Sequence, residues 1–261
     1  MSWLEALILG IIQGLTEFLP VSSSGHLEIG SVLLDAQSSD NLLFAVIVHL
    51  ATALATIAVF KEDILLIIKD VLKFQWNEST QFVTKILLSM VPVFVVAIFF
   101  KDHIESLFVG NLLLVGAMLL ITGCLLLFAH YKRGGDKRVG FFSAIVIGVA
   151  QAIAVLPGIS RSGSTIATAL ILGVEKSKAA RFSFLMVLIP ILGASLLELI
   201  DYSENPGAHS IDTLSLVIGF FAAFISGFIA CKWMIKLVKS GKLTYFAFYC
   251  FIVGLIAIIS A

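Results

Sequence analysis

Long apolar runs are the feature that most limits what this chain can fold into. A transmembrane helix needs roughly 20 consecutive apolar residues, and six segments reach or approach that length: 42–60, 85–100, 112–130, 181–200, 213–231 and 243–260. Only 13% of the residues are charged, whereas soluble domains carry roughly 25%. The chain is therefore predicted to be an all-α integral membrane protein.

Charge and cysteine usage exclude two classes of function. The formal net charge is zero, so the chain has no basic domain to neutralise nucleic-acid phosphates, and we expect no nucleic-acid partner. The three cysteines lie singly in apolar runs or at their ends, and no spacing between them indicates a zinc site or a disulfide.

Two further apolar segments, 4–34 and 140–174, differ from the rest because Pro, Ser and Gly interrupt each of them near its middle. They are copies of each other, which indicates a tandem duplication. The chain is predicted to be a single membrane domain, 1–261, with a first repeat at about 1–135 and a second at about 136–261. At one constant offset along the chain, the aligned pairs are Gln13 with Gln151, Gly25 with Gly163, and Phe44 with Phe182.

Lys and Arg positions predict how the second broken segment lies in the bilayer. If the segment dips in and returns, the opposite side of the membrane carries only Lys101, and 15 basic residues share one side. If the segment crosses the membrane, the basic residues divide equally, with 8 on each side. Basic residues gather on the cytoplasmic side, so the segment is predicted to be re-entrant. The basic loops concerned are 61–85, 131–138, 176–181 and 232–242.

The first broken segment is expected to be re-entrant by its similarity to the second. Each repeat then has three full crossings, and because three is odd the two copies have opposite orientations. The predicted fold is two inverted-topology repeats, each a re-entrant helix–loop–helix hairpin plus three transmembrane helices, with both termini outside. Broken helices of such proteins meet near the bilayer midplane, where they form the binding site.

The tips of the two hairpins carry most of the polar residues inside the membrane, so an acid, an imidazole, several hydroxyls and one cation are expected to meet in one site. The first tip has Gln13, Glu17, Ser22, Ser23, Ser24 and His26, and the second has Ser160, Arg161, Ser162, Ser164 and Thr165.

Arg161 points most directly to the chemistry of this site. An unpaired Arg at the centre of a membrane helix costs roughly 3 kcal/mol, so Arg161 needs an anion. It lies just before an expected helix start, where free backbone N–H groups and a bidentate guanidinium together suit a phosphate. A structural ion pair with Glu17 is the alternative.

Glu17 and Gln13 are four residues apart and share a helix face. The carboxylate suits a divalent cation, with help from Gln13, or a general base; charge balance for Arg161 is again the alternative. Because a free histidine side chain can exchange protons at neutral pH, His26 is expected to transfer protons, although a lone His often only bonds between helices. His49 lies inside the expected helix 42–60 and is interpreted as such a helix–helix hydrogen bonder.

The three serines at 22–24 leave several roles open: a nucleophile, phosphate hydrogen bonds or loop structure.

At the residues of the two hairpin tips the chain resembles the undecaprenyl-pyrophosphate phosphatase family, also called bacitracin-resistance proteins. The matching motifs run from Gln13 to His26 and from Pro157 to Thr165, and the resemblance covers nearly the whole chain. Many members have an acidic residue where this chain has Ala45.

This resemblance implies a phosphatase of the bacterial inner (plasma) membrane that hydrolyses undecaprenyl (C55 polyprenyl) pyrophosphate to the monophosphate. The reaction would recycle the lipid carrier of peptidoglycan synthesis at the outer face and confer bacitracin resistance. The resemblance also implies dependence on Mg²⁺ or Ca²⁺, held by Glu17 and Gln13. The implied catalytic residues are Glu17, Ser23, His26 and Arg161, and the phosphate-binding candidates are Ser160, Arg161, Ser162, Ser164, Thr165, Ser22 and Ser24.

A polyprenyl-phosphate flippase or a secondary transporter is the alternative, because inverted repeats with broken helices are typical of transporters. The type-2 phosphatidic-acid phosphatase superfamily is rejected, because its Arg-x5-His motif is missing from this sequence. The expected partners are the lipid substrate and the membrane, and a homodimer stays open.

Overall fold

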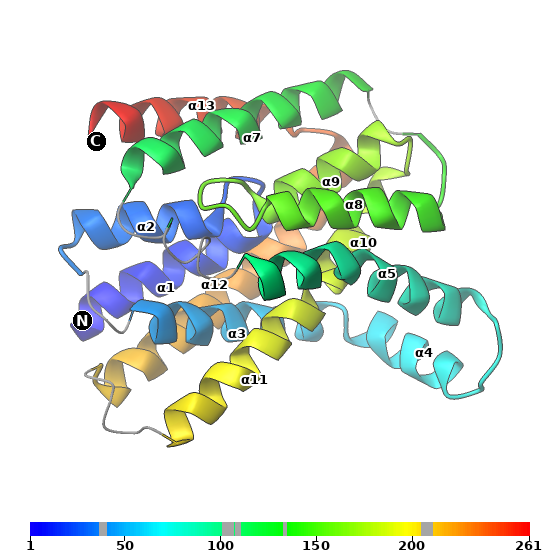
Figure 1. The fold of residues 1–261 in the computed structure, drawn as a ribbon, viewed down its shortest axis with the longest axis horizontal. Helices are drawn as coiled ribbons and strands as arrows, with labels where there is room; N and C mark the ends of the chain where they lie inside the picture. Colours follow the sequence, from blue (N-terminus) through cyan, green and yellow to red (C-terminus); the bar gives the residue numbers. More distant parts are fainter. Residues whose placement is uncertain (37–40, 101–106, 108–110, 133–134, 205–210) are drawn as a thin grey trace.

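The structure is a computed structural model that describes residues 1–36, 41–100, 107, 111–132, 135–204 and 211–261, without the side chains of 41–42, 198–199 and 201–203. Helices make up all of its regular secondary structure in these ranges (Figure 1). They are α1 (Trp3–Phe18), α2 (Ser23–Leu33), α3 (Asn41–Val59), α4 (Lys61–Val71), α5 (Glu78–Phe99), α7 (Leu112–Lys132), α8 (Phe141–Ile153), α9 (Arg161–Ile171), α10 (Lys176–Met186), α11 (Leu188–Glu204), α12 (Thr213–Ser240) and α13 (Thr244–Ile259).

The chain is a multi-span membrane protein. Within the described ranges, four helical segments are long and apolar enough to cross a membrane: α5, α7, α12, and α10 together with most of α11. The pair α3 and α4 makes a fifth if it counts as one span, although it bends by 77° at its break. The all-helical membrane fold is thus confirmed, with fewer full-length spans than the six predicted.

The predicted segment 243–260 forms α13 with bounds that differ by one residue at each end, but its 16 residues cover roughly 24 Å, less than a hydrocarbon core of roughly 30 Å. Two predicted helix boundaries were wrong. Helix α5 begins at Glu78, before the predicted start at 85, and α12 continues beyond the predicted end at 231 to Ser240. Its last turns bury Met234 and Val238, and Lys236 between them is exposed, so its charge stays in water while its apolar stem covers the surface.

The basic segments gather at one end of the molecule. Arg138, before α8, pairs with Glu78 at the start of α5, and Arg181 of α10 donates to Asp63 of α4 at 3.1 Å. Both chain termini lie at the opposite end, on the left in Figure 1. Lys101, the one basic residue predicted for that side, lies outside the described residues.

The duplicated motif builds the same helix start twice. Both α2 and α9 have 11 residues, and each follows a serine N-cap, Ser22 or Ser160. These two serines are equivalent in the repeat, and each side chain accepts a hydrogen bond from the N–H of the glycine three residues later, at 3.3 and 3.0 Å. A serine side chain that satisfies a free N–H is a preferred helix start.

The two hairpins also pack onto the opposite repeat in the same way. Helix α1 packs against α12, and α8 packs against α5. A Cβ on Gly10 of α1 would lie 2.5 Å from the Gly219 carbonyl oxygen, and one on Gly148 of α8 would lie 2.3 Å from the Ser89 carbonyl oxygen. Gly10 and Gly148 are equivalent in the repeat. Glycine at both crossings therefore lets the helix backbones approach closely, as is common between membrane helices.

Candidate active site

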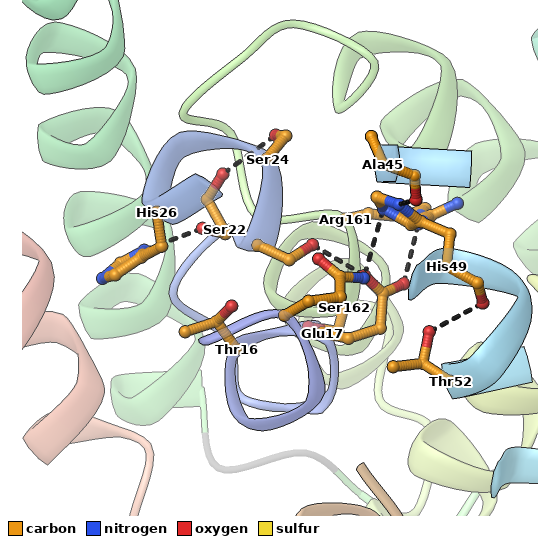
Figure 2. A network of polar contacts seen from close by, with 12 residues as sticks. Thr16, Glu17, Ser22, Ser24, His26, Ala45, His49, Thr52, Arg161 and Ser162 are labelled. Atoms are coloured by element: carbon orange, nitrogen blue, oxygen red, sulfur yellow. Dashed lines mark hydrogen bonds and ion pairs between the residues drawn. The ribbon is translucent and has the colours of Figure 1, made fainter. Parts of the chain in front are cut away.

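The Glu17 carboxylate, in the last turn of α1, is the centre of a polar cluster (Figure 2). Its Oε1 accepts a hydrogen bond from Nη2 of Arg161 at 2.8 Å. Its Oε2 accepts one from Oγ of Ser23 at 2.6 Å and one from Nε2 of Gln13 at 2.9 Å. The Glu17 side chain is only 7% exposed, so these donors replace the water that a carboxylate normally needs. The structure thus brings together four residues predicted from the two hairpin tips.

The repeat explains why Ser23 and Arg161 meet at one carboxylate. They occupy the same position in the two copies, the first residue of α2 and of α9. Each follows its serine cap directly, so the two helix N-termini present one hydroxyl and one guanidinium to the same acid. Positive helix ends also favour a negative group at this place.

His49 is a member of the cluster that the sequence interpretation missed. It lies on α3, and its Nε2 is 3.5 Å from Oε2 of Glu17. Its Nδ1 lies 2.7 Å from the Ala45 carbonyl oxygen, and because a carbonyl only accepts, Nδ1 carries the proton. The available signal was an ionisable residue within an apolar span, which usually marks a functional site.

His26 lies apart from the carboxylate. Figure 2 shows its ring directed away from Glu17. Its Nδ1 donates to the Ser22 carbonyl oxygen at 2.8 Å, and its Nε2 lies 2.8 Å from the hydroxyl of Tyr249 on α13. The His26 and Tyr249 rings stack with centroids 5.5 Å apart. These contacts connect His26 to the turn before α2.

Several predicted phosphate ligands take part in local hydrogen bonds. Ser22 and Ser160 are the helix caps described above, and Ser162 donates to the Leu19 carbonyl oxygen at 3.1 Å. Thr165 donates to the Arg161 carbonyl oxygen at 2.9 Å, and Ser164 is 3% exposed. Their side chains shape and join the two tips.

A cavity of about 190 Å³ adjoins the cluster. Its polar lining residues include Ser23, Ser24, His49, Gln151 and Arg161. Its apolar lining residues include Val93 of α5, Val155 and Pro190 of α11. One water needs about 10–15 Å³ of such space, so the cavity has room for a much larger polar group next to an apolar chain.

Glu17 and Arg161 also line a second cavity of about 20 Å³, with Thr52, Thr56 and Ser162. This volume holds about one water molecule. Arg161 therefore borders both spaces, and Ser23 borders only the larger one.

The model of the Bacitracin resistance protein BacA family matches residues 6–256. The chain belongs to this family. The two hairpin motifs had predicted this membership, which is confirmed.

Curated relatives extend over the whole chain. An undecaprenyl-diphosphatase of Bacteroides thetaiotaomicron is 53% identical over 262 residues, which cover 100% of this chain and 99% of the relative. One of Parabacteroides distasonis is 54% identical over 260 residues, or 99% and 98% of the two chains. A more distant one, of Carboxydothermus hydrogenoformans, is 42% identical over 258 residues, or 97% and 95%.

The donors for a divalent cation are few. The described part of the chain holds no group of three or more His, Cys, Asp and Glu side chains that could bind a metal. Within that part, Oε1 of Gln13 is buried without a hydrogen-bond partner, and the Gln13 amide lies beside Glu17. Mg²⁺ is commonly held by one or two carboxylates together with substrate phosphates. The residues present therefore fit a cation that is shared with a phosphate-bearing substrate.

Proposed function

We propose that this chain is an undecaprenyl-diphosphatase, a membrane enzyme that hydrolyses undecaprenyl (C55 polyprenyl) diphosphate to the monophosphate and phosphate. The main support is the cluster of Glu17, Ser23 and Arg161 beside a cavity lined by both polar and apolar residues. That cavity suits a charged head group carried on a hydrocarbon chain. The family and the names of the curated relatives agree with this activity.

Arg161 binds and stabilises the transferred phosphoryl group. A guanidinium has five N–H donors, and within the described residues only Nη2 has a side-chain partner, at Glu17. The other donors remain for phosphate oxygens, which Arg recognises in a bidentate manner. In phosphoryl transfer, positioning and charge stabilisation of this kind supply most of the rate enhancement.

Ser23 acts as the nucleophile, and Glu17 accepts its proton. The Ser23 hydroxyl already donates to Oε2 of Glu17, so the lone pairs of Oγ are free to face the cavity. Oγ attacks the terminal phosphorus, the anhydride P–O bond breaks and the lipid monophosphate leaves. Water then hydrolyses the phosphoseryl group to release phosphate and restore the hydroxyl. This is the nucleophile–base arrangement expected of covalent catalysis.

Glu17 and Gln13 would hold a Mg²⁺ or Ca²⁺ ion. Oε1 of Gln13, which has no hydrogen-bond partner among the described residues, supports this assignment. When bound, the cation neutralises charge on the phosphate oxygens.

His26 positions the turn that aims Ser23. Ser22 has φ of 70°, a conformation that side chains other than glycine rarely adopt. The hydrogen bond from Nδ1 of His26 to the Ser22 carbonyl oxygen stabilises this strained residue. We therefore assign to His26 a positioning role in place of the proton transfer expected from the sequence.

The two repeats are inverted in the membrane, and their re-entrant hairpins enter from opposite faces. The equivalent serine caps and the matching α1–α12 and α8–α5 packing support this arrangement. The basic end of the molecule is cytoplasmic, both termini are outside, and the site is reached from the outer face. The clustering of basic residues opposite the termini supports this orientation.

The decisive test is phosphate release from undecaprenyl diphosphate by the full-length protein in detergent, with Mg²⁺ or with EDTA. We expect cation-dependent release that falls at least about 100-fold in Glu17→Ala and Arg161→Ala. Lys242→Ala, an exposed change away from the cluster, should retain it. A burst of phosphoserine that Ser23→Ala abolishes would support covalent attack, and its absence would favour a role for Ser23 in orienting water.

No phosphate release from a folded wild-type protein would overturn the proposed function. Transport of polyprenyl phosphate in liposomes would then be measured, because the flippase alternative uses the same scaffold.

A further inference from the structure

Helix α13 contacts the turn between α1 and α2, although it is part of neither hairpin. Sγ of Cys250 donates to the Pro20 carbonyl oxygen at 3.6 Å, and Cys250 also packs with Val21 in a buried apolar cluster. The next residue along α13, Tyr249, contacts His26 in the first turn of α2. Two adjacent residues of α13 therefore support the turn from both of its ends.

The hydrogen bond between Tyr249 and His26 has a defined direction. Nδ1 of His26 faces the Ser22 carbonyl oxygen, which can only accept, so Nδ1 carries the proton of the neutral ring. Nε2 then has a free lone pair, and the Tyr249 hydroxyl, 2.8 Å away, donates to it. The two ring planes differ by only 12°, so the imidazole is also stacked on the phenol ring. Tyr249 thus fixes both the direction of the His26 ring and the nitrogen that carries its proton.

One peptide unit connects the His26 ring to Ser23. The Ser22 carbonyl oxygen accepts hydrogen bonds from the backbone N–H and from Nδ1 of His26, at 3.1 and 2.8 Å. Because the peptide unit between Ser22 and Ser23 is planar, the direction of this carbonyl also sets the position of the Ser23 Cα. Ser22 has a positive φ, and such a strained residue persists only where its surroundings hold it. Contacts to the Ser22 carbonyl therefore decide whether the Ser23 hydroxyl reaches Glu17.

We infer that Tyr249 is a positioning residue for the reaction. Its hydroxyl orients His26, and His26 in turn holds the Ser22 carbonyl so that Ser23 stays directed at Glu17. In the described part of the chain, Tyr249 is not among the residues that line the 190 Å³ cavity, so it acts through His26 and not on the substrate. This inference rests on the proposed function and adds to it a residue of α13, which lies outside both hairpin motifs.

Tyr249→Phe removes the hydroxyl and keeps the ring that stacks on His26. In the full-length enzyme we expect kcat for undecaprenyl diphosphate to fall about fivefold, the usual effect of one hydrogen bond, with KM unchanged. Tyr245→Phe is the matched control, because Tyr245 lies one turn earlier on α13 and is 69% exposed, and it should keep the wild-type kcat. A wild-type kcat in Tyr249→Phe would overturn the inference.

A double-mutant cycle with His26→Ala separates positioning from packing of α13. Without the imidazole, the Tyr249 hydroxyl has no route to Ser23, so Tyr249→Phe should lower kcat no further in the His26→Ala background. Residues that act through one another show this loss of additivity. An equal loss from Tyr249→Phe in the wild-type and His26→Ala backgrounds would show that Tyr249 acts independently of His26, and would overturn the inference.

Nitrogen NMR of histidine-labelled protein in detergent measures the contact without turnover. The His26 signals are assigned by their absence from His26→Asn. We expect the Nε2 signal of His26 to shift in Tyr249→Phe, because Nε2 loses its hydrogen-bond donor, and to stay in place in Tyr245→Phe. An unchanged signal in Tyr249→Phe would overturn the inference. The expected shift in a protein whose wild type releases no phosphate would support the hold of Tyr249 on His26 and contradict the proposed hydrolysis, so the two failures are distinguishable.

Discussion

A single buried carboxylate, Glu17, joins side chains from several helices and the two halves of the chain. Its partners come from α1, from the first residues of α2 and α9, and from α3. Breaking one buried ion pair typically costs about 3–5 kcal/mol because the other charge stays unpaired. Conservative substitutions are therefore more informative here than truncations, since they keep the charge and change only geometry.

Arg161→Lys keeps the positive charge and removes the planar fork of donors. We expect kcat/KM for undecaprenyl diphosphate to fall at least about 100-fold, because an ammonium does not reproduce bidentate phosphate contacts. Steady-state phosphate release measures this. Arg181→Lys is the matched control, since Arg181 pairs with Asp63 of α4 and should tolerate the change. Near-normal turnover in Arg161→Lys would contradict the phosphate-binding role proposed for Arg161.

His26→Asn separates a positioning role from proton transfer. The Asn amide N–H₂ can still donate to the Ser22 carbonyl oxygen, which His26→Ala cannot do. We expect the Ala variant to lose about tenfold in kcat, the equivalent of one hydrogen bond, and the Asn variant to recover most of it. The pH profile of kcat should be unchanged in the Asn variant. Equal loss in both variants, with a changed pH profile, would favour an acid–base role for His26.

At the scale of helices, small residues at equivalent crossings hold the hairpins in place. A Cβ at Gly148 would meet the Ser89 carbonyl oxygen of α5 at 2.3 Å, whereas at Gly193, inside α11, nothing lies within 4 Å of a new Cβ. Both glycines are helical, so the two Gly→Ala substitutions differ mainly in the space available for the new Cβ. Gly148→Ala should destabilise the fold by about 1–3 kcal/mol through overpacking.

Gly193→Ala should be neutral or slightly stabilising, because Ala is the better helix former. Thermal unfolding of both variants in the same detergent checks the comparison. A Tm for Gly148→Ala that equals or exceeds that of Gly193→Ala would contradict the close crossing of α8 and α5.

Elements with local signals were the ones predictable from sequence. Serine and glycine at fixed offsets indicated the breaks and starts of α2 and α9, and the structure has them at Ser23 and Arg161. The end of α12 was not predictable from polarity, because Lys232 and Lys236 resemble a loop while Met234 packs inside. The partnership of His49 with Glu17 depends on how α3 packs against α1, and a single sequence does not contain that information.

At the scale of the whole molecule, the distribution of charge predicts how the protein is oriented in its membrane. The basic segments cluster at one end, through contacts such as Arg138 with Glu78, and the termini lie at the other. Basic loops stay on the cytoplasmic side. In the proposed topology each repeat has an odd number of crossings, so both termini are expected outside and one re-entrant tip enters from each face.

Cysteine labelling in intact cells tests this orientation. In a Cys124→Ser background, we expect Ala261→Cys at the C-terminus to react with a membrane-impermeant maleimide. Lys73→Cys, which is exposed in the loop after α4, should react only after the cells are opened, because its loop carries the basic residues that remain inside. Both variants should be fully labelled in detergent, which controls for reactivity. The opposite pattern in intact cells would invert the molecule and move the opening of the site to the cytoplasmic face, whereas labelling of only one position in detergent would show that exposure, not topology, decided the result.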